Sequence, residues 1–194
     1  MSAGVYNIEI EQGGDYALAV TYKDSAGLVF DLTSYSALMN IKESYFDTTP
    51  IDSLTTASGE ITLTSGIGTA VAGTIAIDAS KSVVTVTIGS GEHGFASGDF
   101  INISGGAPSE YNGAIVVVST PTATTFTYNA VAGDTITDAS VSFYKIQANI
   151  SIDIGHGTTA AYDFSHAFYD LEITQSTTNA KILRGKVNLI RELN

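Results

Sequence analysis

The chain has 194 residues, 44% of them apolar and 14% charged, so it is long enough and apolar enough to fold around its own core. Eight Lys and Arg against 20 Asp and Glu give a net charge of -12, which argues against nucleic acid and anionic membranes as partners. The absence of Cys excludes thiol catalysis and cysteine metal sites. The first nine residues have neither a basic start nor an apolar run, so we expect no secretory signal.

Alternating apolar residues in the first part of the chain predict strands, beginning with Tyr16, Leu18 and Val20. A polar turn at 23–27 predicts a hairpin to 28–30, because Gly27 is able to take a positive φ. Further strands are expected at 37–42 and 59–64. Residues 43–59 lose the alternation and are predicted to form a loop.

The middle of the chain has a different texture, with short alternating runs separated by glycine-rich turns. After residue 146 the first texture returns in strands near 150–154, 169–174 and 183–189. One helical turn or two is expected between 158 and 166. We therefore predict an all-β protein: a β-sandwich host domain formed by residues 1–80 plus 147–194, with residues 81–146 inserted as a small β-barrel or sandwich module.

Candidate catalytic residues are few. The three histidines, His93, His156 and His166, lack the spacing of a zinc site, and no Gly-x-Ser-x-Gly elbow presents a nucleophile. The glycine pairs at 89–91 and 105–106 lack the Lys and the helix of a phosphate loop. We expect no enzyme activity, no metal and no cofactor, and a hydrolase is the least favoured class.

Acidic and aromatic residues are the remaining candidates for binding sites. Scattered carboxylates are the ordinary state of an acidic surface, although two pairs, Asp134 with Asp138 and Asp163 with Asp170, stand close enough in sequence to suggest calcium or acid and base chemistry. Inward parity predicts core positions for Tyr16, Tyr169, Phe126 and Tyr128. Four aromatic residues in loop contexts are the candidates for a glycan-binding site: Tyr45, Phe46, Tyr111 and Tyr162.

Charge is unevenly distributed. Four of the eight basic residues lie in the last 14 positions: Lys181, Arg184, Lys186 and Arg191. Such a strand is expected either to contact an acidic patch of a neighbouring protein or copy, or to be a solvated edge protected by its charges. On the first interpretation the contact residues are Arg184, Lys186 and Arg191. Parity directs Leu183, Val187 and Leu189 to the core and Arg184 and Lys186 outward.

Two stretches resemble a known family. The segment Ile10-Glu11-Gln12-Gly13-Gly14-Asp15-Tyr16, the segment Asp31-Leu32-Thr33-Ser34-Tyr35 and the run Met39-Asn40-Ile41-Lys42 resemble the N-terminal β-domain of small virion structural proteins of tailed bacteriophages, including baseplate-type proteins. The segment from Tyr169 to Ile173, followed by Leu183 to Val187, looks like the end of the same domain.

The middle of the chain resembles a small β module that recurs in phage tail and fibre proteins. The similarity is carried by Glu92-His93-Gly94-Phe95, Ser97-Gly98-Asp99, Tyr111-Asn112-Gly113 and Thr125-Phe126-Thr127-Tyr128. These residues are expected to form turns and core, so the resemblance supplies no catalytic residues.

Together the resemblances imply a non-enzymatic virion structural protein, assembled in the host cytoplasm, that binds other virion proteins and is present in many copies or as a homo-oligomer. Tail, baseplate or neck is the expected location. The alternatives are a capsid decoration protein and a receptor- or glycan-binding module.

Overall fold

The computed structural model describes residues 3–25, 27–78, 82–106, 112–129 and 140–191, and nearly all of its regular structure is β-strand. The chain divides into two compact units. The first, called the sandwich unit, comprises residues 1–22, 31–65 and 148–194, and the second, called the curled-sheet unit, comprises residues 23–30 and 66–147. The all-β fold class predicted from the sequence is confirmed.

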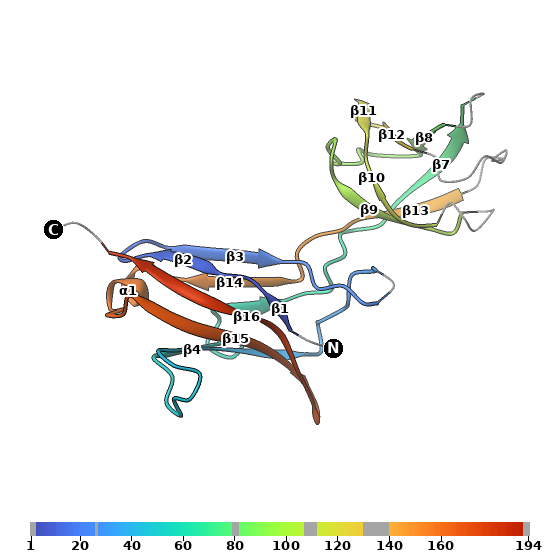
Figure 1. The fold of residues 1–194 in the computed structure, drawn as a ribbon. Coiled ribbons are helices and arrows are strands. Elements are labelled where there is room, and N and C mark those ends of the chain that lie inside the picture. The colour runs from blue at the N-terminus through green and yellow to red at the C-terminus, as the bar shows by residue number, and fades with distance from the viewer. Residues whose placement is uncertain (1–2, 26, 79–81, 107–111, 130–139, 192–194) are drawn as a thin grey trace. The chain divides into compact units, whose positions relative to one another are not determined.

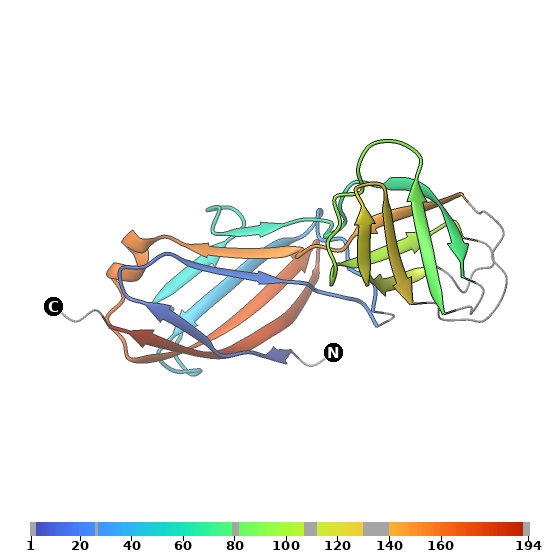
Figure 2. The ribbon, with the colours of Figure 1, turned by 90° about the horizontal axis from the view of Figure 1, so that it is seen from above.

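The sandwich unit contains two sheets and one short helix (Figure 1 and Figure 2). The larger sheet has the order β1-β16-β15-β4-β5, with β2 also paired to β16. Its strands are β1 (Gly4–Val5), β2 (Ile8–Glu11), β4 (Ser36–Lys42), β5 (Asp52–Thr55), β15 (His166–Gln175) and β16 (Thr178–Ile190). The smaller sheet has the order β3-β14-β6, with strands β3 (Tyr16–Val20), β6 (Ile61–Leu63) and β14 (Ile150–Ile154). The helix is α1 (His156–Ala160).

The core lies between these sheets because alternate residues of each strand are apolar. In β4 the buried residues are Ala37, Met39 and Ile41, as their spacing predicts, and in β15 Tyr169 is 1% exposed. Figure 1 shows β3 and β14 in a layer above β4 and β15. Three strands of this unit were missed by the sequence prediction: β1 and β2 at the N-terminus, and β5, which lies within the predicted loop 43–59.

The N-terminal strands run parallel to β16 and are held there by a close backbone approach at Gly185. A Cβ at this position would stand only 2.7 Å from the carbonyl carbon of Tyr6, and closer still to its oxygen. The Tyr169 hydroxyl donates a hydrogen bond of 2.8 Å to that oxygen, and Tyr6 N donates to the Arg184 carbonyl at 3.0 Å. Glycine is therefore required at position 185 of β16, where the backbone of Tyr6 passes it between β1 and β2.

The curled-sheet unit is a seven-stranded sheet with the order β10-β9-β13-β7-β8-β12-β11. Its strands are β7 (Val71–Ile77), β8 (Val83–Ile88), β9 (Phe100–Ser104), β10 (Gly113–Val116), β11 (Ser119–Thr122), β12 (Thr125–Asn129) and β13 (Ser140–Lys145). The two edge strands β10 and β11 are consecutive in the chain, so Val117 and Val118 bring the edges together. Val117 N donates to the Asp99 carbonyl and Val118 N to the Thr127 carbonyl. The sheet curls around one apolar core that includes Phe126, Tyr128 and Phe143.

The boundary between the units differs from the predicted division at residues 80 and 81. Strand β7 is paired with β8 and β13, and its Ile75 is fully buried in the core of the curled-sheet unit. The sequence did not predict that the second unit begins before β7, because the Gly- and Ala-rich residues there show little alternation of apolar and polar side chains. The second unit therefore begins at residue 66 and also includes the hairpin 23–30.

Asn149 fixes the sandwich unit where the chain leaves it and returns. The side chain is 0% exposed; its Oδ1 accepts from Tyr22 N at 2.6 Å and its Nδ2 donates to Tyr22 O at 2.9 Å. Thr64 N donates to the Asn149 carbonyl at 3.0 Å and Leu32 N to the Thr64 carbonyl at 3.2 Å. The points where the chain leaves and re-enters the sandwich unit are thus held together by hydrogen bonds within that unit.

A deletion series tests the boundary. Replacing residues 23–30 and 66–147 with short Gly-Ser linkers is expected to leave a sandwich that unfolds cooperatively in urea, because the flanking residues are already held together. Replacing only 81–146 is expected to give an aggregating protein, since β7 then loses both of its partner strands and exposes Ile75. Equal, cooperative unfolding of the two deletion variants would contradict the boundary at residue 66.

A substitution tests the backbone contact. Gly185→Ala is expected to lower the free energy of unfolding by about 1–3 kcal/mol, because the new methyl group meets backbone that has to shift. Gly157→Ala in α1, where a Cβ meets nothing within 4 Å, is the control, and its effect is expected to stay within about 1 kcal/mol. Urea unfolding gives the free energies, and hydrogen exchange of the residue 4–11 amides shows whether the N-terminal strands are released. Unchanged exchange in Gly185→Ala would disprove the requirement.

Candidate protein-binding surface

The basic side chains of β16 share one face of the larger sheet because the strand contains a bulge. β16 pairs regularly with β15 from Asn188 to Leu183, but the next pair joins Glu172 to Lys181, so Ile182 is an extra residue. In a regular strand Lys181 and Arg184 would point to opposite faces. The bulge brings Lys181 to the exposed face that also carries Arg184 and Lys186.

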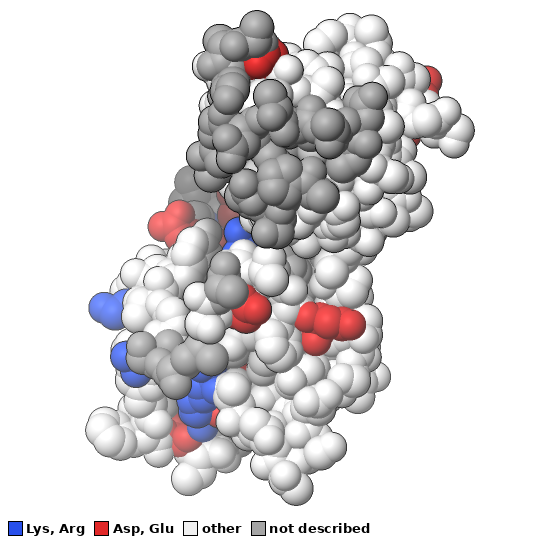
Figure 3. All heavy atoms as spheres, turned by 90° about the vertical axis from the view of Figure 1, so that its right-hand side faces the viewer, with Lys and Arg blue, Asp and Glu red and all other residues white. Residues whose placement is uncertain are grey.

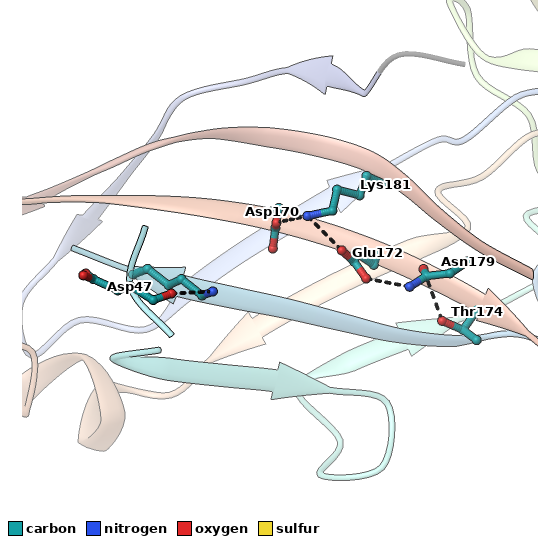
Figure 4. Close-up of polar contacts among 7 residues, drawn as sticks. Asp47, Asp170, Glu172, Thr174, Asn179 and Lys181 are labelled. Carbon is teal, nitrogen blue, oxygen red and sulfur yellow. Dashed lines mark hydrogen bonds and ion pairs between the residues drawn. The ribbon is translucent and has the colours of Figure 1, made fainter. Parts of the chain in front are cut away.

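Lys181 is fully engaged with its own sheet (Figure 4). Its Nζ lies 2.5 Å from Asp170 Oδ2 and 3.0 Å from Glu172 Oε1, and Asn179 Nδ2 donates to the second oxygen of Glu172 at 2.8 Å. The hydrogen bonds from Asn179 and then Lys181 hold the pKa of Glu172 below its usual value, while the hydrogen bond to Asp170 raises the pKa of Lys181. Both acidic groups of β15 on this face are therefore bound by one lysine.

Arg184 and Lys186 differ from the other two basic residues of the C-terminal segment. Arg191, one of the three predicted contact residues, forms an ion pair of 2.8 Å with Asp163. Asp170 stands directly opposite Arg184 in the register, but it is bound by Lys181. Across the described residues, no ion pair joins Arg184 or Lys186 to a carboxylate. These two cations are thus available to a partner.

A shallow hollow of about 540 Å³ lies beside the two cations. It is lined by Val5, Asn7, Tyr45, Arg184, Gly185 and Lys186. Asn7 Oδ1 accepts from Lys186 N at 3.0 Å, and the Tyr45 ring packs on Phe168 of β15 with centroids 4.3 Å apart. In Figure 3 the Lys and Arg atoms lie mainly toward the left-hand side of the molecule, with Asp and Glu atoms beside them and further to the right.

The loop between β4 and β5 presents an exposed aromatic side chain near this hollow. Phe46 is 94% exposed. The turn that carries it is tied by its own hydrogen bonds: Ser44 N donates to Asp47 Oδ2 at 2.8 Å, Asp47 N to Ser44 O at 3.1 Å, and Lys42 Nζ to Asp47 O at 3.0 Å. Figure 4 includes Asp47 in this turn. Phe46 is therefore held out by an ordered turn.

The aromatic residues predicted for glycan binding separate into three groups. Tyr45 and Phe46 are exposed, Tyr45 by 58%. Tyr162 is only 4% exposed, and its hydroxyl donates to Asp52 at 2.6 Å, so its proposed role as a surface residue is wrong. Burial and the bond to Asp52 raise the pKa of Tyr162. Tyr111 lies outside the described residues.

The histidines have structural partners. His93 is 6% exposed: its Nδ1 accepts from Phe95 N at 2.9 Å, and its Nε2 faces the carbonyl oxygens of Thr122 and Thr125 at 3.0 and 3.2 Å. This neutral tautomer packs against Phe126 and pins the 92–95 turn to the curled sheet. His156 contacts Asp15, and His166 contacts Asn188.

Sites for metals and membrane helices were also sought in the described part of the chain. No group of three or more His, Asp or Glu is placed there to hold a metal ion. Asp163 and Asp170 are each paired to a basic residue, whereas Asp134 and Asp138 lie outside the described residues. No helix in the described ranges has the length and hydropathy needed to cross a membrane.

The Lys181 network predicts a pH-dependent contribution to stability. Lys181→Met is expected to raise the pKa of Glu172 toward its ordinary value of 4.5. When folding lowers the pKa of a carboxyl group, that group stabilises the protein at a pH above its pKa in the unfolded state. The stabilisation is lost as the pH falls through its pKa in the folded state. The variant should therefore be less stable than wild type at pH 7, by less than about 1 kcal/mol, and the difference should shrink near pH 3.

Lys186→Met is the matched control for this measurement, because Lys186 has no carboxylate in an ion pair within the described residues. Its effect on the free energy of unfolding in urea is expected to be the same at both pH values. Parallel pH profiles for the two variants would show that the network contributes nothing.

Comparisons with known proteins give no family assignment. No protein-family model matches the chain, and no curated protein matches it either. The function is therefore argued from the residues and the surface described above.

Proposed function

We propose that the protein is a non-enzymatic structural component of a tailed-bacteriophage particle, present in many copies and attached to neighbouring virion proteins through the outer face of its larger sheet. The observation that carries the proposal is the pair of exposed cations, Arg184 and Lys186, at a hollow on an otherwise acidic chain. The sequence resemblance to baseplate-type β-domains supports the virion, assembled in the host cytoplasm, as the location. Tail, baseplate or neck is the first position, and a decoration protein on the capsid is the second.

The arrangement of the strand supports a binding role for these cations. On β16 the residues that alternate with Arg184 and Lys186 are Gly185 and Val187, both buried in the sandwich. The backbone that carries the cations is paired with strands on both sides, so binding has to order only the side chains and not the strand. Charge complementarity at such a surface mainly raises association rates and specificity. This is the behaviour expected of a subunit that has to find one neighbour during assembly.

A glycan-binding role is the second candidate, favoured by the position of exposed Tyr45 in the same hollow as Arg184. An aromatic face beside polar groups is suited to stacking on a sugar. A glycan array with wild-type protein and Tyr45→Ala distinguishes the two functions. A specific signal that disappears in the variant would favour recognition over structure.

The location is tested by mass spectrometry of purified particles whose genome encodes this chain, together with gold labelling of the protein. The proposal requires the protein in the particle at a fixed copy number. Its absence from purified particles would refute the virion role.

The surface is tested by removing its charges. Arg184→Gln with Lys186→Gln is expected to change the free energy of unfolding by less than about 1 kcal/mol and to reduce the occupancy of the protein in particles severalfold. Thr85→Glu with Thr87→Glu, at exposed positions of β8, changes the net charge by the same amount and is expected to preserve occupancy. If both double variants enter particles at wild-type occupancy across a salt series, the basic strand is only a solvated edge.

A further inference from the structure

Carboxylates of β2 lie beside the cations of β16 on the outer face of the larger sheet, and their positions follow from the strand register. β2 is parallel to β16, with Glu9 level with Asn188 and Glu11 level with Ile190. Paired residues of neighbouring strands point to the same face, so both glutamates share the face of Arg184 and Lys186. Both are exposed, and within the described residues neither forms an ion pair. Along the strand direction this part of the face thus has a basic half on β16 and an acidic half on the neighbouring β2.

The two halves are placed symmetrically about Val187. Along β16, Lys186 and the level of Glu9 lie one residue on either side of Val187, and Arg184 and the level of Glu11 lie three residues on either side. At about 3.3 Å per residue, these offsets are about 3 Å and 10 Å. A two-fold axis level with Val187, perpendicular to the strands and parallel to the sheet, therefore brings each cation level with a carboxylate of a second copy. The two are offset sideways by one strand spacing, about 4.8 Å, which the long Arg and Lys side chains can span.

We propose that two copies of this chain bind face to face through this strip, with Arg184 of one copy against Glu11 of the other and Lys186 against Glu9. Two-fold symmetry repeats each contact, so the surface is self-complementary and four ion pairs form. The other face-to-face two-fold, with its axis along the strands, keeps every residue at its own level, so the cations of one copy would lie level with the cations of the other and the glutamates level with the glutamates. The charge pattern therefore selects the antiparallel arrangement.

Exposed apolar side chains flank the strip and add to the contact. Val5 is 70% exposed, Ile190 is 49% exposed, and Tyr45 lies over Phe168 beside Lys186. Exposed ion pairs are worth little individually, so the contact in solution is weak and sensitive to salt. In a particle, where copies are held close together, a high effective concentration strengthens such a contact without any change in the surface.

This inference deepens the proposed function and rests on its premise that the outer face is a protein-binding surface. It names a second copy of the chain as the partner. The test uses full-length protein in solution, so it does not depend on whether the chain is found in particles.

The experiment uses two charge-reversed proteins, Arg184→Glu with Lys186→Glu and Glu9→Lys with Glu11→Lys. Each alone places like charges against each other and is expected to self-associate at least tenfold more weakly than wild type in sedimentation equilibrium at about 0.1 M salt. Mixed together, they place opposite charges at all four contacts, so a heterodimer is expected at least as strong as the wild-type dimer. Both proteins remain net negative, so the pairing cannot result from overall attraction. Circular dichroism and urea unfolding of each protein control for folding.

Wild-type dimerisation at about 0.1 M salt that is lost at about 1 M, together with association of the mixed variants, would support the proposal. A wild-type protein that stays monomeric at high concentration, or mixed variants that fail to associate, would overturn it. If particle occupancy depends on Arg184 and Lys186 while wild type is monomeric, the partner is another virion protein and only this inference fails. A salt-sensitive dimer absent from particles would refute the virion role and leave the self-contact standing.

Discussion

The passage of Tyr6 across Gly185 is the contact on which the outer face of the sandwich unit depends. Because residue 185 has no side chain, the backbone of Tyr6 lies directly on β16, and its carbonyl oxygen accepts from the Tyr169 hydroxyl. Burial raises the pKa of that hydroxyl, so the donor keeps its proton. This contact places β1 and β2 in register along β16. Val5 and Asn7 then line the hollow, and the glutamates of β2 come to lie beside the cations of β16.

The bulge at Ile182 is the second constraint, because it decides which cations stay free. Without it, Lys181 would point to the other face of the sheet, and Asp170 would stand opposite Arg184 with no competing cation. With it, Lys181 binds both Asp170 and Glu172, and among the described residues Arg184 forms no ion pair. One extra residue in a strand therefore gives Asp170 another cation to bind and leaves Arg184 outside that ion pair.

The sequence predicts those features that depend on alternation within one strand. It predicts the all-β class, the buried side of β4, and the core positions of Tyr169, Phe126 and Tyr128. It does not predict the bulge, because Ile182 is apolar and unremarkable in a run that includes Leu183, and only pairing with β15 shows the shift. The period of Ile8 and Ile10 was a usable signal for β2, but the parallel partner of such a short strand is not readable from its residues. Tyr162 was misjudged because a loop context does not show that its hydroxyl reaches Asp52 across the chain.

Repulsion from the net charge of the chain and attraction at Arg184 and Lys186 act over different distances. Copies that carry a net charge of -12 repel each other, but at about 0.1 M salt the Debye length is about 10 Å, so most of that repulsion is screened. Ion pairs at contact distance are screened much less. Once two surfaces meet, attraction between their opposite charges therefore outweighs the repulsion caused by the net charge of the two copies. Only surfaces with uncompensated cations gain from this difference. Arg184 and Lys186 are such cations, and the neighbouring Glu9 and Glu11 make the same face complementary to itself. The average charge thus keeps the association of copies weak, and the local pattern decides in which orientation they associate.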